Sequence, residues 1–142
     1  VVHASCSVDA PGVIRHHFGD GLIVGEPSGA DTPRVQALHT LLQKAGFNAT
    51  LSPQIQKDIW YKLWGNMTVN PISALTHATL EAICADAGTR AVARAMMLEA
   101  QGIAEALGVR FPIPVDKRLD GGAAVGSCAV RRAATSVSLR RR

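Results

Sequence analysis

The sequence predicts a small α/β portion followed by a mainly α-helical portion. The first part, residues 1–51, holds short apolar runs separated by Gly, Pro and Asp, a pattern typical of strands and turns. The composition changes at Ser52-Pro53, after which apolar residues recur at helical spacing as far as Leu107. With 47% hydrophobic residues, the chain suits a globular core. We predict three portions: residues 1–51, residues 52–120 and a tail at residues 121–142.

Three strands are predicted before the first helix. Val1–Val8 reads as a buried strand that ends in a turn rich in Asp, Pro and Gly. Val13–His17 and Leu22–Glu26 follow, and we predict that Phe18–Gly21 joins them as a hairpin.

A helix is predicted from Pro33 to about Ala45. Thr32 is a good N-cap, and Pro33 suits the first helical position, where its missing N–H costs nothing. The apolar stripe of this helix consists of Leu38, Leu41, Leu42 and Ala45. Gly46 ends the helix, and Phe47–Leu51 is a final short strand. Because this stretch cannot bury its own apolar surface, we expect it to be the closing part of a larger α/β domain.

The second portion is predicted to be helical. One helix runs from Pro53 to about Ala74, Thr79–Cys84 forms a short helical turn, and Asp86–Leu107 forms a second long helix stopped by Gly108. Val115 to about Ala124 is a further short helix. The remaining residues show no clear period, and we expect a poorly packed tail.

The net charge of +4 comes from this tail. Residues 1–120 hold 10 Lys and Arg against 11 Asp and Glu, whereas residues 121–142 hold five Arg and no acid. We therefore expect no functional binding of nucleic acid by the folded body. No apolar run is long enough for a membrane span, and the first residues do not resemble a signal peptide. We expect no membrane partner, and we expect that the sequence begins inside a longer chain.

The cysteines and histidines suggest neither a disulfide framework nor a metal site. Cys6, Cys84 and Cys128 are far apart and odd in number, which favours a reduced, cytoplasmic setting. His16 and His17 are adjacent in a predicted strand, so their side chains are expected on opposite faces.

The segment that carries chemistry lies in the first long helix. On a helical wheel an apolar stripe is formed by Trp60, Leu63, Trp64 and Met67. A polar column on the other side is formed by Lys62, Asn66 and Asn70. Pro71 cannot donate a hydrogen bond, so we expect the helix to bend or loosen there. From the pattern alone, a solvated helix face is the favoured explanation of the column, although repeated Asn is costly inside a helix without a partner.

These residues resemble a known family signature. Trp60-x-Lys62-x3-Asn66-x3-Asn70-Pro71, continuing Ile-Ser-Ala-Leu, is similar to the start of the helical domain in ketopantoate reductases, also called 2-dehydropantoate 2-reductases. The runs at residues 11–16 and 21–26 resemble the end of that family's nucleotide-binding domain. The resemblance implies the end of a Rossmann-like domain, followed by a partial helical C-terminal domain of the 6-phosphogluconate-dehydrogenase-like type.

The resemblance also implies an activity. The family reduces 2-dehydropantoate to pantoate with NADPH, in the biosynthesis of pantothenate and coenzyme A. Lys62 matches the lysine that protonates the carbonyl oxygen, and Asn66 and Asn70 match side chains that orient the substrate. An ammonium aimed at an oxygen that gains negative charge stabilises that charge and can deliver the proton.

The cofactor-binding loop of the family has no match in this sequence. The run Gly19-x-Gly21-x3-Gly25 has the wrong spacing and precedes no helix, so we do not expect it to bind a dinucleotide. The family's Ser-Met-rich helix and its acidic residue are also unmatched after Gly122, for which a changed reading frame is one hypothesis. We predict that the 142-residue chain alone does not oxidise NADPH with ketopantoate.

Further interpretations remain open, and one of them is a binder of nucleic acid or membrane through the basic tail. The helical portion could act as a non-catalytic interaction or dimerisation module, forming a homo-oligomer, because exposed apolar surface favours association. Alternatively, the reductase could prefer another 2-oxo acid.

Overall fold

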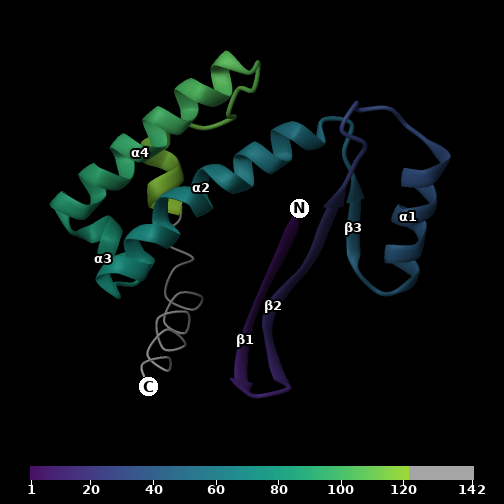
Figure 1. The fold of residues 1–142 in the computed structure, drawn as a ribbon, viewed down its shortest axis with the longest axis horizontal. Coiled ribbons are helices and arrows are strands. Elements are labelled where there is room, and N and C mark those ends of the chain that lie inside the picture. Colours follow the sequence, from purple (N-terminus) through teal and green to yellow (C-terminus); the bar gives the residue numbers. More distant parts are fainter. Residues whose placement is uncertain (122–142) are drawn as a thin grey trace. The chain divides into compact units, whose positions relative to one another are not determined.

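The computed structural model describes residues 1–121. In chain order its elements are β1 (Val2–Ala10), β2 (Val13–Val24), α1 (Pro33–Lys44), β3 (Asn48–Leu51), α2 (Ile55–Thr76), α3 (Leu80–Ala85), α4 (Ala87–Ala106) and a helical stretch at residues 115–121 (Figure 1). The elements form two compact units that meet between Trp60 and Tyr61. We call them the sheet unit and the helical unit. The structure thus confirms a small α/β portion followed by helices.

The sheet has the strand order β1-β2-β3. β1 and β2 form an antiparallel hairpin, in which Val2 pairs with Leu22 and Val8 with Ile14. β3 pairs with the end of β2 in parallel, so the chain crosses over between them through α1, which lies beside β3 (Figure 1). The result is a β-α-β crossover with one antiparallel strand added.

The predicted hairpin at Phe18–Gly21 is wrong. Val13–His17 and most of Leu22–Glu26 belong to one long strand, β2, which pairs with β1 from Val13 to Leu22. A β-bulge absorbs the turn-like residues: Gly19 has a φ of 82°, and a side chain there would collide with the carbonyl oxygen of His3. Gly19 was interpreted as part of a turn, but its positive φ allows a continuous strand to form a bulge.

Helix α1 begins as predicted but buries less than predicted. The Thr32 hydroxyl accepts a hydrogen bond from the Val35 N–H, and Gly46 follows the helix with a φ of 89°. Val35 is the residue that α1 buries, whereas Leu38 and Leu41 of the predicted stripe are exposed. The start and stop signals are local and were read correctly, but the buried face is set by what α1 packs against.

The start of α2 belongs to the sheet unit. Ser52 is buried, and its hydroxyl accepts from the Gln54 N–H and donates to the Asp58 carboxylate. Asp58 therefore helps to fix the helix start. Ile55 packs so close to Gly25 that a Cβ atom on Gly25 would lie 2.8 Å from the Ile55 Cβ.

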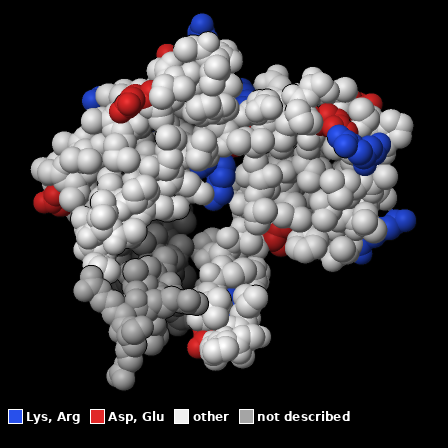
Figure 2. Space-filling model, in the orientation of Figure 1, with Lys and Arg blue, Asp and Glu red and all other residues white. Residues whose placement is uncertain are grey.

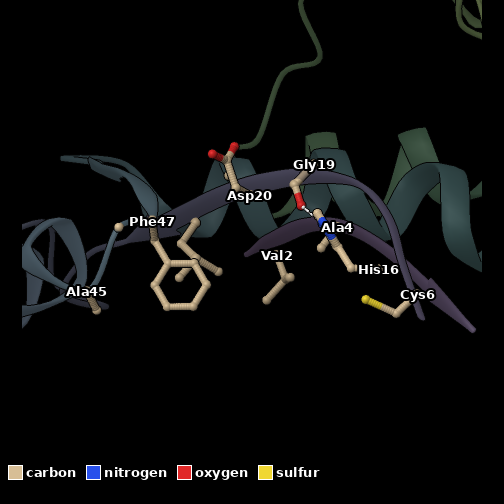
Figure 3. Close-up of a pocket in the computed structure, with 11 residues that line it drawn as sticks. Val2, Ala4, Cys6, His16, Gly19, Asp20, Ala45 and Phe47 are labelled. Carbon is tan, nitrogen blue, oxygen red and sulfur yellow. Dashed lines mark hydrogen bonds between the residues drawn. The ribbon is translucent and has the colours of Figure 1, made fainter. Parts of the chain in front are cut away.

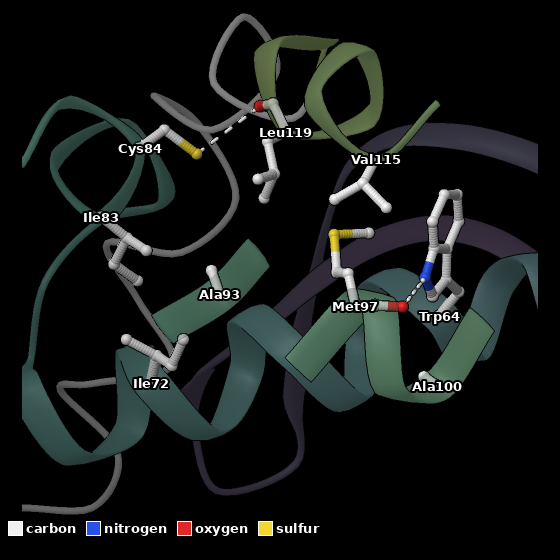
Figure 4. Close-up of a cluster of buried hydrophobic side chains, with 9 residues drawn as sticks. All are labelled: Trp64, Ile72, Ile83, Cys84, Ala93, Met97, Ala100, Val115 and Leu119. Carbon is white, nitrogen blue, oxygen red and sulfur yellow. Dashed lines mark hydrogen bonds between the residues drawn. The ribbon is translucent and has the colours of Figure 1, made fainter. Parts of the chain in front are cut away.

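The helical unit is organised around one buried cluster (Figure 4). Its members are Trp64, Ile72, Ile83, Cys84, Ala93, Met97, Ala100, Val115 and Leu119. Trp64 has no exposed surface, and its indole N–H donates to the Met97 carbonyl oxygen at 2.8 Å. Its ring stacks on that of Phe111 with 4.2 Å between the centroids. One side chain thus joins α2, α4 and the segment that follows α4.

The buried face of α2 differs from the predicted stripe. Trp64, Thr68 and Ile72 are buried, whereas Leu63 and Met67 are 41% and 39% exposed. Thr68 can lie inside because its hydroxyl donates to the Trp64 carbonyl oxygen one turn earlier. The buried stripe and the predicted stripe share Trp64 but otherwise lie on different sides of the helix.

The two remaining helices of this unit confirm the sequence reading. Thr79 and Asp86 are the N-caps of α3 and α4, with side chains that accept from Ala82 N–H and Thr89 N–H. α4 ends at Ala106, and Gly108 follows with a φ of 80°. The helix predicted from Val115 is present as far as residue 121. The continuation of this helix and the predicted tail lie outside the described residues, as does the region where the family carries its Ser-Met-rich helix.

Candidate functional site

The predicted catalytic column lies in the part of α2 that belongs to the helical unit. Lys62 is half-buried, while Asn66 and Asn70 are exposed. The three residues recur at intervals of four on the side of α2 turned away from Trp64 and Ile72. None of the three side chains makes a hydrogen bond or ion pair within the described residues. One helix therefore presents an ammonium and two carboxamides in a row, with their polar atoms available.

An aromatic group holds this helix in place. The Tyr61 ring lies 6.3 Å from both the Trp64 ring and the Phe111 ring, measured between centroids. Since Trp64 is locked by its hydrogen bond to Met97 and its stack on Phe111, α2 cannot easily rotate about its axis. The direction in which Lys62 projects is therefore fixed by the core.

Pro71 follows the column directly inside α2. The helix continues through it to Thr76, although Pro71 has no N–H to donate to the Met67 carbonyl oxygen. The Met67 carbonyl oxygen, one turn before Pro71, therefore lacks the hydrogen bond that an ordinary helix would give it.

Glu26 is a buried acid that the sequence reading did not single out. It is 7% exposed, accepts from the Thr32 hydroxyl at 2.6 Å and pairs with the Arg34 guanidinium at 2.5 Å. The hydrogen bonds from Arg34 and Thr32 lower the pKa of Glu26. The sequence sign that could have indicated this network is an acid, Glu26, six residues before the N-cap Thr32. Both carboxylate oxygens bond partners from the start of α1, so Glu26 ties the end of β2 to that helix.

A hollow of about 320 Å³ lies in the sheet unit (Figure 3). Residues of β1, β2 and the turn before β3 line it, with Val2, Ala4, Cys6, His16 and Phe47 toward the cavity. The His16 ring nitrogen lies 2.6 Å from the Gly19 carbonyl oxygen. Asp20 is the acidic residue of the lining, and no Lys or Arg belongs to it. An acid in a lining without Lys or Arg disfavours the binding of a dinucleotide pyrophosphate.

The glycines of the false fingerprint also have structural roles. Gly19 and Gly21 lie within β2, where no helix N-terminus follows, and Gly25 admits Ile55. This glycine run therefore does not form a loop of the kind that holds a dinucleotide pyrophosphate.

Metal and thiol chemistry find little support in the described part of the chain. Within residues 1–121 no group of three His, Cys, Asp or Glu side chains could hold a metal ion. His17 bonds the Ser7 hydroxyl rather than sharing a ligand with His16. Burial raises the pKa of the Cys84 thiol, which donates to the Leu119 carbonyl oxygen. Cys84 is therefore a core residue rather than a nucleophile.

The charged side chains are scattered over the surface in view, with both signs interspersed (Figure 2). No helix in the described range has both the length and the apolar character needed to span a membrane.

A two-part chain, with a β-α-β end and a helical unit that opens on a Lys-Asn column, defines a class of α/β-plus-α proteins. Residues 54–138 match the family model for the C-terminal part of ketopantoate reductases (ketopantoate reductase PanE/ApbA C terminal). The chain belongs to the ketopantoate reductase family.

Known relatives agree with this assignment. The chain is 56% identical over 126 residues to a 2-dehydropantoate 2-reductase of Mesorhizobium japonicum, an alignment that covers 89% of this chain and 39% of the relative. The chain thus spans well under half the length of this curated relative.

Solved structures show the same fold. A Ralstonia solanacearum protein provisionally assigned as a ketopantoate reductase superposes with a TM-score of 0.86 at 38% identity, over 95% of this chain and 41% of that one. A PanE/ApbA family ketopantoate reductase of Ralstonia eutropha gives 0.81 at 25% identity, over all of this chain and 46% of that one. The sheet and the helical unit therefore correspond to contiguous parts of a larger reductase fold.

Proposed function

We propose that this chain supplies the substrate-binding and proton-donating part of an NADPH-dependent reductase that converts 2-dehydropantoate to pantoate. The observation that carries the proposal is the Lys62, Asn66 and Asn70 column, held by Trp64 on the side of α2 away from the core. Membership in the ketopantoate reductase family and the high identity to a protein with that name support it. By family, residues 1–51 would be the end of the nucleotide-binding domain and residues 52–120 part of the helical domain.

The column suits the chemistry of ketone reduction. Negative charge builds on the ketone oxygen during the reaction, and the Lys62 ammonium would stabilise it and then donate the proton. The carboxamides of Asn66 and Asn70 would hold the hydroxyl or carboxylate of the substrate without adding charge next to Lys62. NADPH would supply the hydride when bound, and no residue of the described range is assigned to hold it.

A fusion tests the proposal. The whole chain would follow the N-terminal segment of the Mesorhizobium japonicum relative, with activity measured as NADPH oxidation in the presence of 2-dehydropantoate. We expect turnover from the fusion and none from the 142-residue chain alone. Lys62→Ala should lower kcat by roughly 10²- to 10⁴-fold, the usual contribution of a general acid. Asn66→Ala and Asn70→Ala should mainly raise KM.

The matched control is Lys57→Ala, which removes an exposed lysine from the same helix. A folded fusion with no activity, or a Lys62→Ala fusion as active as the control, would contradict the proposal. Faster turnover with another 2-oxo acid in a substrate panel would keep the enzyme class but replace the substrate.

A second candidate is a helical dimerisation module. Val92 and Ile103 lie on the same side of α4 and are 54% and 50% exposed. Such apolar positions favour self-association. If this surface makes a homo-oligomer, Val92→Glu with Ile103→Glu should convert the chain to a monomer in sedimentation experiments. Oligomers that persist in this variant would contradict the module.

A further inference from the structure

Arg118 occupies an unusual position in the helical unit. It belongs to the helical stretch at residues 115–121 and is half-buried. Its guanidinium carbon lies 4.7 Å from the centroid of the Tyr61 ring, a cation–π contact. Tyr61 in turn packs on Phe111 and Trp64. A flat cationic group is thus laid on the aromatic support of the candidate site.

Gly65 makes room for this guanidinium. A Cβ atom at Gly65 would lie 3.0 Å from the Arg118 Nη2 and 3.7 Å from its Cζ. Gly inside a helix costs about 0.8–1.0 kcal/mol relative to Ala. Helix α2 therefore lacks a side chain at a position where the Arg118 guanidinium lies against it.

The position of Gly65 brings Arg118 next to the catalytic column. Gly65 follows Lys62 by three residues, so the two positions are neighbours on the helix surface, about 5–6 Å apart. Asn66 is the next residue. The Arg118 guanidinium, which comes from residues 115–121, thus lies over a position of α2 that neighbours Lys62 on the helix surface.

Arg118 has no acidic partner in the described residues. The acids of its own helical stretch turn toward α4, where Asp120 pairs with Arg90 at 2.8 Å and Asp116 with Arg94 at 3.0 Å. The Arg118 side chain makes no ion pair or hydrogen bond within residues 1–121. Its planar N–H donors remain available, and a guanidinium matches a carboxylate in two-pronged geometry.

We propose that Arg118 binds the carboxylate of the 2-oxo acid substrate while Lys62 engages the adjacent ketone oxygen. The two oxygen-bearing carbons of a 2-oxo acid are directly bonded, so the groups that bind them must be neighbours, as Arg118 and Lys62 are. This role rests on the proposed function. It makes Arg118 the residue that selects 2-oxo acids over uncharged ketones.

The test uses the fusion described above, with two substitutions that each remove one positive charge from neighbouring positions: Arg118→Gln, and Lys117→Gln at an exposed position as the control. Loss of a charge-assisted bond of about 1.5–3 kcal/mol corresponds to roughly a 10- to 100-fold rise in KM for 2-dehydropantoate. We expect this rise in Arg118→Gln, a change in kcat of less than about threefold, and no change in Lys117→Gln. Arg118→Lys should recover part of the affinity.

A second substrate separates binding from a folding defect. The methyl ester of the 2-oxo acid has no carboxylate, so Arg118→Gln and the unsubstituted fusion should reduce it with the same KM. Gly65→Ala displaces the guanidinium and should raise KM for the acid but not for the ester, while raising the melting temperature of the helical unit. Equal losses for acid and ester in Arg118→Gln, or an unchanged KM for the acid, would overturn the role of Arg118. Inactivity of the unsubstituted fusion would instead contradict the proposed function.

Discussion

In the helical unit, nine side chains form one buried cluster around Trp64, whereas the apolar residues that the sheet unit buries are Val35, Ala49 and Ile55. The sheet unit instead leaves large apolar side chains such as Val8 and Ile14 on its surface, each 72% exposed. Its order comes mainly from backbone pairing and from polar ties such as that of Glu26. The side chains that support the candidate site therefore lie in the helical unit, and we expect this unit to be the more stable of the two.

The largest effect on stability is expected from replacing Trp64 in the helical core. Trp64→Ala removes a fully buried ring, its stack on Phe111 and its bond to Met97. We expect a loss of about 3–5 kcal/mol in the free energy of unfolding, measured by denaturant titration. Leu63→Ala, at an exposed neighbouring position, is the control and should cost less than about 1 kcal/mol. Similar losses in both variants would mean that the core is not centred on Trp64.

In the sheet unit the largest effect is expected at Gly19. Gly12 and Gly19 both have positive φ, but a Cβ atom meets nothing within 4 Å at Gly12 and collides with the His3 carbonyl at Gly19. Gly12→Ala should cost about 1–2 kcal/mol for the left-handed backbone. Gly19→Ala should cost roughly 2–4 kcal/mol, because strain from the added atom is included. Hydrogen exchange of the β1 and β2 amides measures both, and equal protection in the two variants would argue against the bulge.

Helix caps should have smaller effects. Thr79→Ala removes the side chain that accepts from the Ala82 N–H at the start of α3, which should cost about 1 kcal/mol. Thr40→Ala, at an exposed position inside α1, should be neutral or slightly stabilising, because Ala is the better helix former. Thermal unfolding of the two variants gives the comparison, and a stabilising Thr79→Ala would show that the cap is not used.

The smallest expected effect is the pH dependence of the sheet unit. The pKa of Glu26 is lowered from its ordinary value of 4.5 in the folded chain. An acid with a depressed folded pKa stabilises the fold above its unfolded pKa, and that contribution is lost as the pH falls through the folded value. The melting temperature should therefore fall on acidification below about pH 4.5, and Glu26→Gln should weaken this dependence. Glu99→Gln, at an exposed helix position, should leave it unchanged, and identical pH profiles for both variants would contradict the assignment.

Local signals predicted much of the fold. The caps at Thr32, Thr79 and Asp86 and the stops at Gly46 and Gly108 depend on residues within one turn, so the helix ends could be read from the sequence. The bulge at Gly19 could not, because it depends on pairing with β1. The buried face of α2 could not either, since it is set by partners such as Met97, 33 residues away.

The candidate site was predictable only in part. The spacing of Lys62, Asn66 and Asn70 is a property of one helix, so the column follows from the sequence. Arg118 reaches the same helix from 53 positions beyond Gly65, and no period connects them. The one local sign of the contact in the sequence is the glycine in the middle of α2.

The ion pairs that join Arg90 and Arg94 to Asp116 and Asp120 have a consequence for conditions in solution. These side chains are 29% to 67% exposed, and dissolved ions screen exposed pairs over a Debye length of about 8 Å at physiological ionic strength. Concentrated salt should therefore loosen the outer side of the 115–121 stretch while the buried Val115 and Leu119 stay in place. The tilt of that short helix, and with it the seat of the guanidinium on Tyr61, would then vary with the electrolyte content of the buffer.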